Sequence, residues 1–356
     1  MHFTSPRVRA GIALSGPTVS EPRGPEEGPS FDALTPEVVL TSLEDSHGVR
    51  LDGTLQYYSS YVNRVYGVRT DTGTEYVAKF YRPGRWSVDA IADEHEFILD
   101  CAAAELPVVP PLPDPDGFTL QLLEVEGPTG ARDYPYAVYE KRGGRGFDAE
   151  RDEEWLRLGA LAGRVHAVGA MGRSPHRLTC TPQASTRRFA DELRAAGVVH
   201  PEIADEFFTL VEQGIGLIDP LFDGIEHQRI HGDFHRGNVL DRGDDGLLLI
   251  DFDDTMMGPP VQDLWLLLPD HAWAARRELN LVIEGYEQFR ELDQRSLRLI
   301  EPLRLMRMIY YLAWSALQRD DHRFLQANPG WGTRAFWIRE VEDLRVQLDA
   351  IVEDQG

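Results

Sequence analysis

One stretch of eight residues, His-Gly-Asp-Phe-His-Arg-Gly-Asn at 231–238, constrains the fold of this chain more than any other feature. It places Asp233 and Asn238 five positions apart, and a second acidic group, which begins at Asp251, follows an apolar run. Turn-forming residues at 241–246 precede that run, so the segment predicts a β-hairpin. Each acid, taken alone, could simply cap a turn, which is the usual role of a carboxylate in a turn. Their occurrence together and in this order indicates one shared site.

The eight residues match the H-x-D-x-x-x-x-N catalytic loop of phosphotransferases. In such a loop the Asp accepts or orients a hydroxyl proton, and the Asn turns back to ligate the Mg²⁺ that bridges the nucleotide phosphates. Mg²⁺ prefers oxygen ligands and takes few of them from the protein. We therefore predict Asp233 and Asp251 as catalytic residues, Asn238 and Asp251 as metal ligands, Mg²⁺ as the cofactor and ATP as a substrate.

Lysine is almost absent from the chain, because only Lys79 and Lys141 among its 36 basic residues are lysines. Lys79 lies on the predicted strand 75–80, where a catalytic loop of this kind requires a lysine. A compact ammonium contacts two phosphates in a way that the planar fork of arginine does not reproduce. A lysine at the end of a strand is more often a solvated edge residue. The rarity of lysine nevertheless favours a nucleotide-binding role for Lys79.

The helix predicted next, over 88–104, offers a carboxylate that could hold Lys79. Its candidate acids are Asp93, Glu94 and Glu96. Glu94 lies beside the apolar stripe of the helix, so we predict Glu94 as the partner of Lys79 and keep Glu96 as the second choice.

Further nucleotide contacts are predicted from neighbouring elements. Val77 shares a face with Lys79, because side chains two apart on a strand point the same way, and we expect it to cover the adenine. The linker from Glu140 to Arg142 would offer backbone groups to the adenine edge. No glycine-rich loop precedes Lys79. The polar residues 59–63 could cradle phosphate instead, although an ordinary hairpin turn is nearly as well supported.

The pattern of elements predicts an α+β fold with two lobes. We expect a disordered tail rich in proline and glycine at 1–30, a small lobe at 31–139, a hinge at 140–144 and a larger, mainly helical lobe at 145–356. The small lobe should hold an antiparallel sheet and the helix that carries Glu94. Its predicted strands are 57–58, 64–68, 75–80, 118–125 and 134–139, and a helix should begin at Pro36. The helices predicted in the larger lobe are 153–168, 187–196, 203–217, 261–268, 276–289 and 300–318.

Charge and cysteine content limit the possible partners and the compartment. A formal net charge of −23 opposes binding to a phosphate backbone, and no apolar run approaches the ~18 residues of a membrane-spanning helix. Two cysteines are too few for a disulfide framework, which indicates a reducing compartment. We therefore expect a cytoplasmic monomer with no nucleic-acid or membrane partner.

The motifs resemble those of the aminoglycoside phosphotransferase and choline kinase superfamily, whose fold is similar to that of eukaryotic protein kinases. The residues that carry this resemblance are His231-Gly232-Asp233, His235, Asn238 and Asp251-Phe252-Asp253-Asp254. Within the superfamily the chain looks most like bacterial stress response kinase A, a family of cytoplasmic serine/threonine protein kinases. The segments similar to that family are 60–66, 79–83, 258–265, 301–304 and 310–314, and the resemblance runs from about residue 31 to the C-terminus.

The resemblance implies roles that spacing alone does not indicate. Ser60 would be a phosphate-loop residue near ATP, and Asp263 would brace the catalytic loop with its carboxylate. Three further residues, His235, Arg304 and Arg307, could support the site or face the acceptor, although core and surface roles are at least as well supported.

Three functions remain open from the sequence, and we favour the first. The first is a Mg²⁺·ATP protein kinase acting on serine or threonine hydroxyls, whose cleft we expect to be acidic. The second is a kinase of a small alcohol such as an aminoglycoside, choline or homoserine. Both use the same phosphoryl-transfer residues, so the motifs do not separate them. The third, a nucleotide-binding pseudokinase, is disfavoured because Lys79, Asp233, Asn238 and Asp251 are all present.

Overall fold

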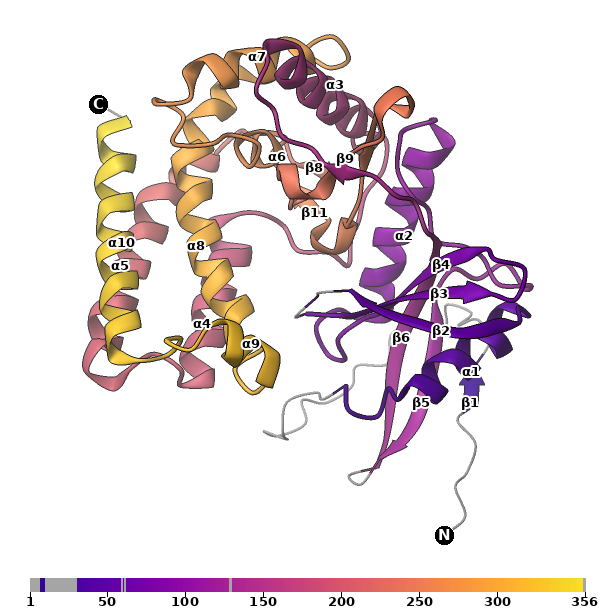
Figure 1. Ribbon diagram of the computed structural model, residues 1–356. Helices are drawn as coiled ribbons and strands as arrows, with labels where there is room; N and C mark the ends of the chain where they lie inside the picture. The colour runs from indigo at the N-terminus through magenta and orange to yellow at the C-terminus, as the bar shows by residue number, and fades with distance from the viewer. Residues whose placement is uncertain (1–6, 10–30, 59, 61, 128–129, 355–356) are drawn as a thin grey trace. The chain divides into compact units, whose positions relative to one another are not determined.

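The computed structural model describes residues 7–9, 31–58, 60, 62–127 and 130–354 (Figure 1). These residues divide into two compact units. The first holds the described residues up to Leu99 together with Val109–Gly143, and the second holds Asp100–Val108 and the described residues from Gly144 onward. One unit contains an antiparallel sheet and the other is mostly helical, which confirms the predicted α+β class.

The described strands of the first unit form one antiparallel sheet with the order β1-β5-β6-β4-β3-β2. Its strands are β1 (Arg7–Arg9), β2 (Leu51–Tyr58), β3 (Arg64–Thr70), β4 (Glu75–Phe80), β5 (Gln121–Gly127) and β6 (Gly130–Glu140). The strand that carries Lys79, β4, lies between β3 and β6 and pairs with both. The tail expected at residues 1–30 contains β1, whose backbone pairs with β5. The rest of that range lies outside the described residues.

Helix α1 (Pro36–His47) begins where the sequence predicts it. The side chain of Thr35 accepts a hydrogen bond from the backbone of Val38 at 3.3 Å, and Pro36 occupies the first turn. One face of α1, which includes Val39 and Leu43, packs into the core of the sheet. Helix α2 (Val88–Ala103) carries Glu94. Its last turn belongs to the second unit, where Asp100 pairs with Arg229 at 2.8 Å.

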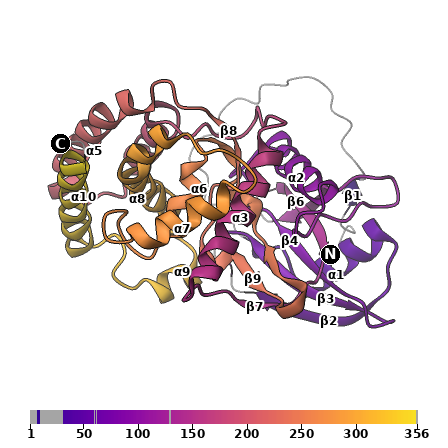
Figure 2. The same cartoon turned by 90° about the horizontal axis from the view of Figure 1, so that it is seen from above.

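The second unit is built around three long helices that lie side by side, α5 (Pro201–Ile218), α8 (Ile300–Ala316) and α10 (Arg334–Asp354) (Figures 1 and 2). Buried side chains from all three share one core, among them Phe207 of α5, Leu303 of α8 and Trp337 of α10. The other helices of the unit are α3 (Asp152–Gly169), α4 (Arg187–Ala196), α6 (Val261–Trp265), α7 (Arg276–Tyr286) and α9 (His322–Ala327). The sequence prediction stops at residue 318 and therefore misses α9 and α10.

Helix α3 packs closely against α7 because both present glycine at the contact (Figure 2). A Cβ on Gly159 of α3 would lie 2.0 Å from the carbonyl oxygen of Val282, and one on Gly285 of α7 would lie 2.1 Å from that of Leu156. Only hydrogen at these positions allows the two backbones to approach so closely.

Short strands interrupt the helices of the second unit. The predicted hairpin is present as β9 (Val239–Asp241) and β10 (Leu247–Leu249), and β7 (Arg145–Gly146) pairs with β9. A second pair consists of β8 (Gln228–Ile230) and β11 (Met256–Gly258). No helix among the described residues combines the length and the hydropathy that a bilayer crossing requires.

Candidate active site

The catalytic loop leaves β8 and runs into β9, and its shape depends on Gly232. This residue has φ +83°, and a Cβ there would lie 2.1 Å from the carbonyl oxygen of Asp254. A side chain is therefore excluded both by the left-handed conformation and by the contact. This explains why glycine stands between His231 and Asp233 in this chain.

Asp263 of α6 braces this loop from inside the unit. Its two carboxylate oxygens accept the backbone N–H groups of His231 and Gly232, each at 2.8 Å. The ring of His166, on α3, donates from Nε2 to the same carboxylate at 2.8 Å, and the hydroxyl of Tyr286, on α7, lies 3.2 Å from Nδ1 of that ring. The side chains of His166 and Asp263 are fully buried. The packing of α3 on α7 is thus connected to the catalytic loop by hydrogen bonds.

Asp233 lies in the loop between a guanidinium and an imidazole. Nη2 of Arg307, from α8, donates to its Oδ1 at 2.6 Å, and Nε2 of His235 lies 3.5 Å from its Oδ2. Burial raises the pKa of Asp233, but the hydrogen bond from His235 and the charges of Arg307 and His235 outweigh burial and hold this pKa well below its usual range. The hydrogen bond to Asp233 in turn raises the pKa of His235. Asp233 is therefore an oriented, ionised carboxylate.

Asn238 and Asp251 are brought together by the backbone of the hairpin. The N–H of Ile250, the residue before Asp251, donates to the carbonyl of Asn238 at 3.0 Å, and the carbonyl of Ile250 accepts from His231 at 3.0 Å. Asp251 itself is exposed and has φ +62°. Backbone bonds therefore join the predicted metal ligands to the catalytic loop.

The chemistry of these two side chains fits a divalent cation. Nδ2 of Asn238 donates to the backbone carbonyl of Asp233 at 2.9 Å, which leaves Oδ1 as the amide atom that can face a ligand. An amide oxygen and a carboxylate are hard donors of the type that Mg²⁺ takes from proteins. Within the described residues no three His, Cys, Asp or Glu side chains gather into a metal-binding group, and the candidate donors are this amide and this carboxylate.

In the first unit, Lys79 and Glu94 form a buried ion pair, with Nζ 3.3 Å from Oε1. Glu94, the acid predicted as the partner, contacts Lys79, whereas the second choice, Glu96, is exposed. The hydroxyl of Tyr81 donates to the same Oε1 at 3.1 Å and lies 3.1 Å from Nε2 of His95. No spacing in the sequence predicts Tyr81 or His95 as part of this network.

The other predicted nucleotide-binding residues lie around the same sheet. Val77 is two residues before Lys79 on β4 and is half-buried. The hydroxyl of Ser60, in the connection between β2 and β3, accepts the backbone N–H of Asn63 at 3.3 Å. Glu140, the last residue of β6, pairs with Arg142 on the surface. Ser59 and Tyr61 of the predicted phosphate loop lie outside the described residues.

Of the three residues assigned a supporting role by resemblance, His235 and Arg307 contact Asp233, but Arg304 does not contact it in any described interaction. Nε of Arg304 lies 3.2 Å from a carboxylate oxygen of Glu301, and its guanidinium lies over the ring of Trp265. No local pattern distinguishes the two arginines in the sequence, since they lie one helical turn apart on α8.

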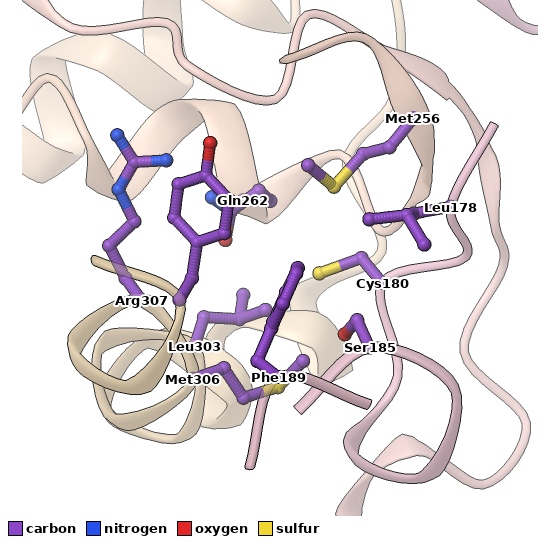
Figure 3. Close-up of a pocket in the computed structure, with 10 residues that line it drawn as sticks. Leu178, Cys180, Ser185, Phe189, Met256, Gln262, Leu303, Met306 and Arg307 are labelled. Carbon is purple, nitrogen blue, oxygen red and sulfur yellow. The ribbon is translucent and has the colours of Figure 1, made fainter. Parts of the chain in front are cut away.

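A cavity of about 40 Å³ lies beside the catalytic loop in the second unit (Figure 3). Its lining includes Arg307 and Gln262, and Nε2 of Gln262 donates to the carbonyl of Gly232 at 3.4 Å. The remaining lining is mostly apolar, and none of the described residues that form it is an acid. The acidic character expected of the cleft is therefore not found at this cavity.

Comparison with known proteins gives the relationships of the chain. Residues 54–300 match the phosphotransferase enzyme family. Stress response kinase A of Escherichia coli (strain K12) is 33% identical over 330 residues, which cover 91% of this chain and 95% of that protein. The serine/threonine protein kinase RdoA of Salmonella typhimurium is 34% identical over 325 residues, which cover 87% of this chain and 92% of that protein.

Solved structures share the fold at lower identity. Amicoumacin kinase hAmiN, in complex with AMP-PNP, Ca²⁺ and Ami, has a TM-score of 0.68 at 20% identity, over 86% of this chain and 92% of that one. A microcompartment-associated aminopropanol kinase has a TM-score of 0.66 at 16% identity, over 88% of this chain and 98% of that one. These relationships confirm the predicted family, fold class and kinase activity. The chain belongs to the phosphotransferase enzyme family and, within it, to the stress response kinase A proteins.

Proposed function

We propose that this kinase transfers the γ-phosphoryl group of ATP to serine or threonine hydroxyls of a protein, in a Mg²⁺-dependent reaction in the cytoplasm, and that it acts as a monomer. The observation that carries the choice of acceptor is the similarity to a relative named serine/threonine protein kinase, which extends over 87% of this chain. The Lys79–Glu94 pair of the first unit and the hydrogen bond from Asn238 to the backbone of Asp233 in the second support the proposal.

In this proposal Asp233 acts on the acceptor hydroxyl. Its carboxylate accepts a hydrogen bond from the hydroxyl and takes the proton as the new O–P bond forms and the bond from the γ-phosphorus to the ADP oxygen breaks. Phosphoryl transfer passes through a loose transition state, so orientation of the hydroxyl contributes more than proton removal. Arg307 and His235, which contact the two carboxylate oxygens, would hold Asp233 in that orientation.

Lys79, positioned by Glu94, would contact the phosphates of ATP. Asn238 and Asp251 would hold Mg²⁺, which when bound neutralises charge on the phosphate oxygens. Ser60 would donate its hydroxyl proton to a phosphate, because its oxygen already accepts the N–H of Asn63.

The adenine would lie against Val77 and the segment after β6. The backbone N–H of Lys141 donates to the carbonyl of Glu75 at 3.1 Å, so it faces β4. N–H groups of successive residues in an extended chain point to opposite edges, so those of Glu140 and Arg142 point away from β4. The bridge between Pro111 and Tyr139 engages the N–H of Glu140 at that edge, so we assign the carbonyl of Glu140 and the N–H of Arg142 to the adenine edge.

A small-alcohol kinase is the second candidate, since solved structures with this fold include kinases of amicoumacin and aminopropanol. To decide, the purified chain should be incubated with γ-labelled ATP, Mg²⁺, casein as a general protein substrate, and a panel containing an aminoglycoside, choline and homoserine. We expect phosphoserine or phosphothreonine in the protein. Label only in a small alcohol would refute the protein-kinase proposal. Asp233→Asn serves as the control that should lose transfer.

A further inference from the structure

The cavity beside Asp233 is joined to the catalytic loop through three of its lining residues. Arg307 donates to the carboxylate of Asp233, and Gln262 donates to the carbonyl of Gly232. The methyl group of Met256 lies 2.9 Å from the point that a Cβ of Gly232 would occupy. A group in this cavity would therefore contact side chains that themselves contact Asp233 and the loop around it.

The interior of the cavity is apolar. Its walls include Leu178, Cys180, Phe189, Leu303 and Met306 (Figure 3). Burial raises the pKa of the Cys180 thiol to about 12, so this side chain is uncharged at neutral pH. Apolar walls favour an apolar occupant, because a polar one would lose its hydrogen bonds to water.

The polar side chains of the lining already have partners within the protein. The hydroxyl of Tyr310 donates to Asp254 at 2.7 Å, and that of Ser185 donates to the carbonyl of Thr181 at 2.9 Å. Arg307 is the charged residue among the described residues of the lining. A cationic occupant would meet this arginine and no carboxylate, so both charge and polarity oppose it.

The size of the cavity limits its occupant. A volume of about 40 Å³ holds roughly three water molecules, or a side chain of about two to four heavy atoms. A valine side chain, with three heavy atoms, matches this size and an alanine side chain is smaller, whereas an amino sugar is too large.

We propose that this cavity is an acceptor pocket that holds a small aliphatic side chain next to the hydroxyl to be phosphorylated. The inference rests on the proposed protein-kinase function and adds a substrate class to it: serine or threonine flanked by a small aliphatic residue, rather than an acceptor that carries an amine. An acceptor with such a residue would place it between Phe189, Met306 and Leu178.

The test uses the full chain, Mg²⁺·ATP and peptides with one central serine, in which each neighbouring position carries Gly, Ala, Val, Leu or Lys in turn. We expect kcat/KM to be about 10-fold higher for Val than for Gly at one neighbouring position, and lower for Lys than for Gly. Leu178→Phe should fill the cavity from a half-buried position and bring the Val-to-Gly ratio close to one. A wild-type enzyme with no preference, or an unchanged ratio in folded Leu178→Phe, would overturn the inference.

Leu210→Phe is the matched control, because Leu210 is also half-buried in the helical core but does not line the cavity. It should keep the wild-type ratio. If Leu178→Phe fails to fold, Leu178→Ala enlarges the same cavity and should move the preference from Val towards Leu, and an unchanged preference would count against the pocket. Peptides phosphorylated without any flanking preference would refute this pocket alone. Label in small alcohols and in no peptide would refute the protein-kinase function and this pocket together.

Discussion

At the scale of single residues, the contacts of Asp233 indicate that Arg307 positions its carboxylate and does not bind ATP. Arg307 holds one carboxylate oxygen at 2.6 Å, and Arg304, one turn earlier on α8, pairs with Glu301 instead. Arg307→Gln removes the charge and the hydrogen bond on Asp233. We expect kcat to fall about 10- to 100-fold, as for other groups that position a reacting side chain, with KM for ATP unchanged, as initial-rate kinetics would measure.

Two further variants separate this role from a structural one. Arg307→Lys keeps a charge near Asp233 and should recover part of kcat, whereas Arg304→Gln should leave both kinetic constants near their wild-type values. Equal losses in Arg307→Gln and Arg304→Gln, or a rise in KM for ATP alone, would contradict the positioning role.

The sequence predicts those parts of the site that depend on short spacing. Asp233 and Asn238 lie on one loop, and Lys79 and Glu94 are 15 residues apart on consecutive elements. Arg307, by contrast, reaches Asp233 from 74 residues away, and no local pattern connects the two. Tyr81 and His95 are found only when β4 and α2 are packed together, because their link to Glu94 is a tertiary contact.

At the scale of elements, the contact between α3 and α7 supports the catalytic loop through His166, Tyr286 and Asp263. Gly159→Ala would place a methyl group 2.0 Å from a backbone carbonyl of α7, so the helices must separate. We expect the free energy of unfolding to fall by about 3 kcal/mol and turnover to fall with it, as denaturant titration and kinetics would measure.

Gly216→Ala on α5 is the same type of substitution, but here we expect the free energy of unfolding to rise. Gly216 is exposed, and a Cβ there meets nothing within 4 Å. Alanine in an open helical position should raise stability by about 0.5 to 1 kcal/mol. A stable Gly159→Ala protein would show that the two helices can separate without cost, contrary to the close packing seen here.

Helix α10 is absent from the sequence prediction, although its apolar residues follow a helical pattern. Its buried Trp337, Val341, Leu344 and Ile351 recur at helical spacing. The two- and three-residue strands β7, β8 and β11 are different, because so few residues cannot establish a period of two, and their pairing depends on distant partners.

Glu340 makes the stability contributed by α10 dependent on pH. Burial, with a smaller contribution from Asp343, raises its pKa from 4.5 to about 7 in the folded state. Ionisation is therefore easier in the unfolded chain, and the free energy of unfolding should fall as pH rises from about 4.5 to about 7 and stay low above that range. Glu340→Gln should remove this slope and stabilise the protein at pH 8 by about 2 kcal/mol after allowance for solvent screening. Exposed Glu353→Gln is the control in urea titrations at both ends of the range, and a slope retained in Glu340→Gln would exclude this origin.

At the scale of the whole molecule, the proposed nucleotide ligands come from both units, with Lys79 in the first and Asp251 in the second. If one Mg²⁺·ATP is held by both, its stabilising effect should depend on both side chains. At a concentration 100 times Kd, binding adds about 2.7 kcal/mol, which is roughly a 5 °C rise in Tm for a chain of this size. Lys79→Met and Asp251→Asn should each lose most of this rise, while Asp233→Asn should keep it and lose transfer. If Lys79→Met or Asp251→Asn kept the full rise in Tm, the unit that carries the altered residue would not be involved in binding the nucleotide.

Because lysine is scarce in this chain, the second lysine serves as the control for the test at Lys79. Lys141 is the other lysine, and it forms an exposed ion pair with Glu75 at 2.9 Å. A positive charge alone suffices there, so Lys141→Arg should keep the Mg²⁺·ATP-dependent rise in Tm. At Lys79 a planar guanidinium would have to fit beside Glu94, within a pair that is almost wholly buried, and also meet two phosphates as a compact ammonium does. We therefore expect Lys79→Arg to lose most of the rise as measured by thermal denaturation with and without Mg²⁺·ATP. If Lys79→Arg kept the full rise, the survival of lysine at this position would have no explanation in phosphate binding, and the assignment of Lys79 to the nucleotide would have to be abandoned.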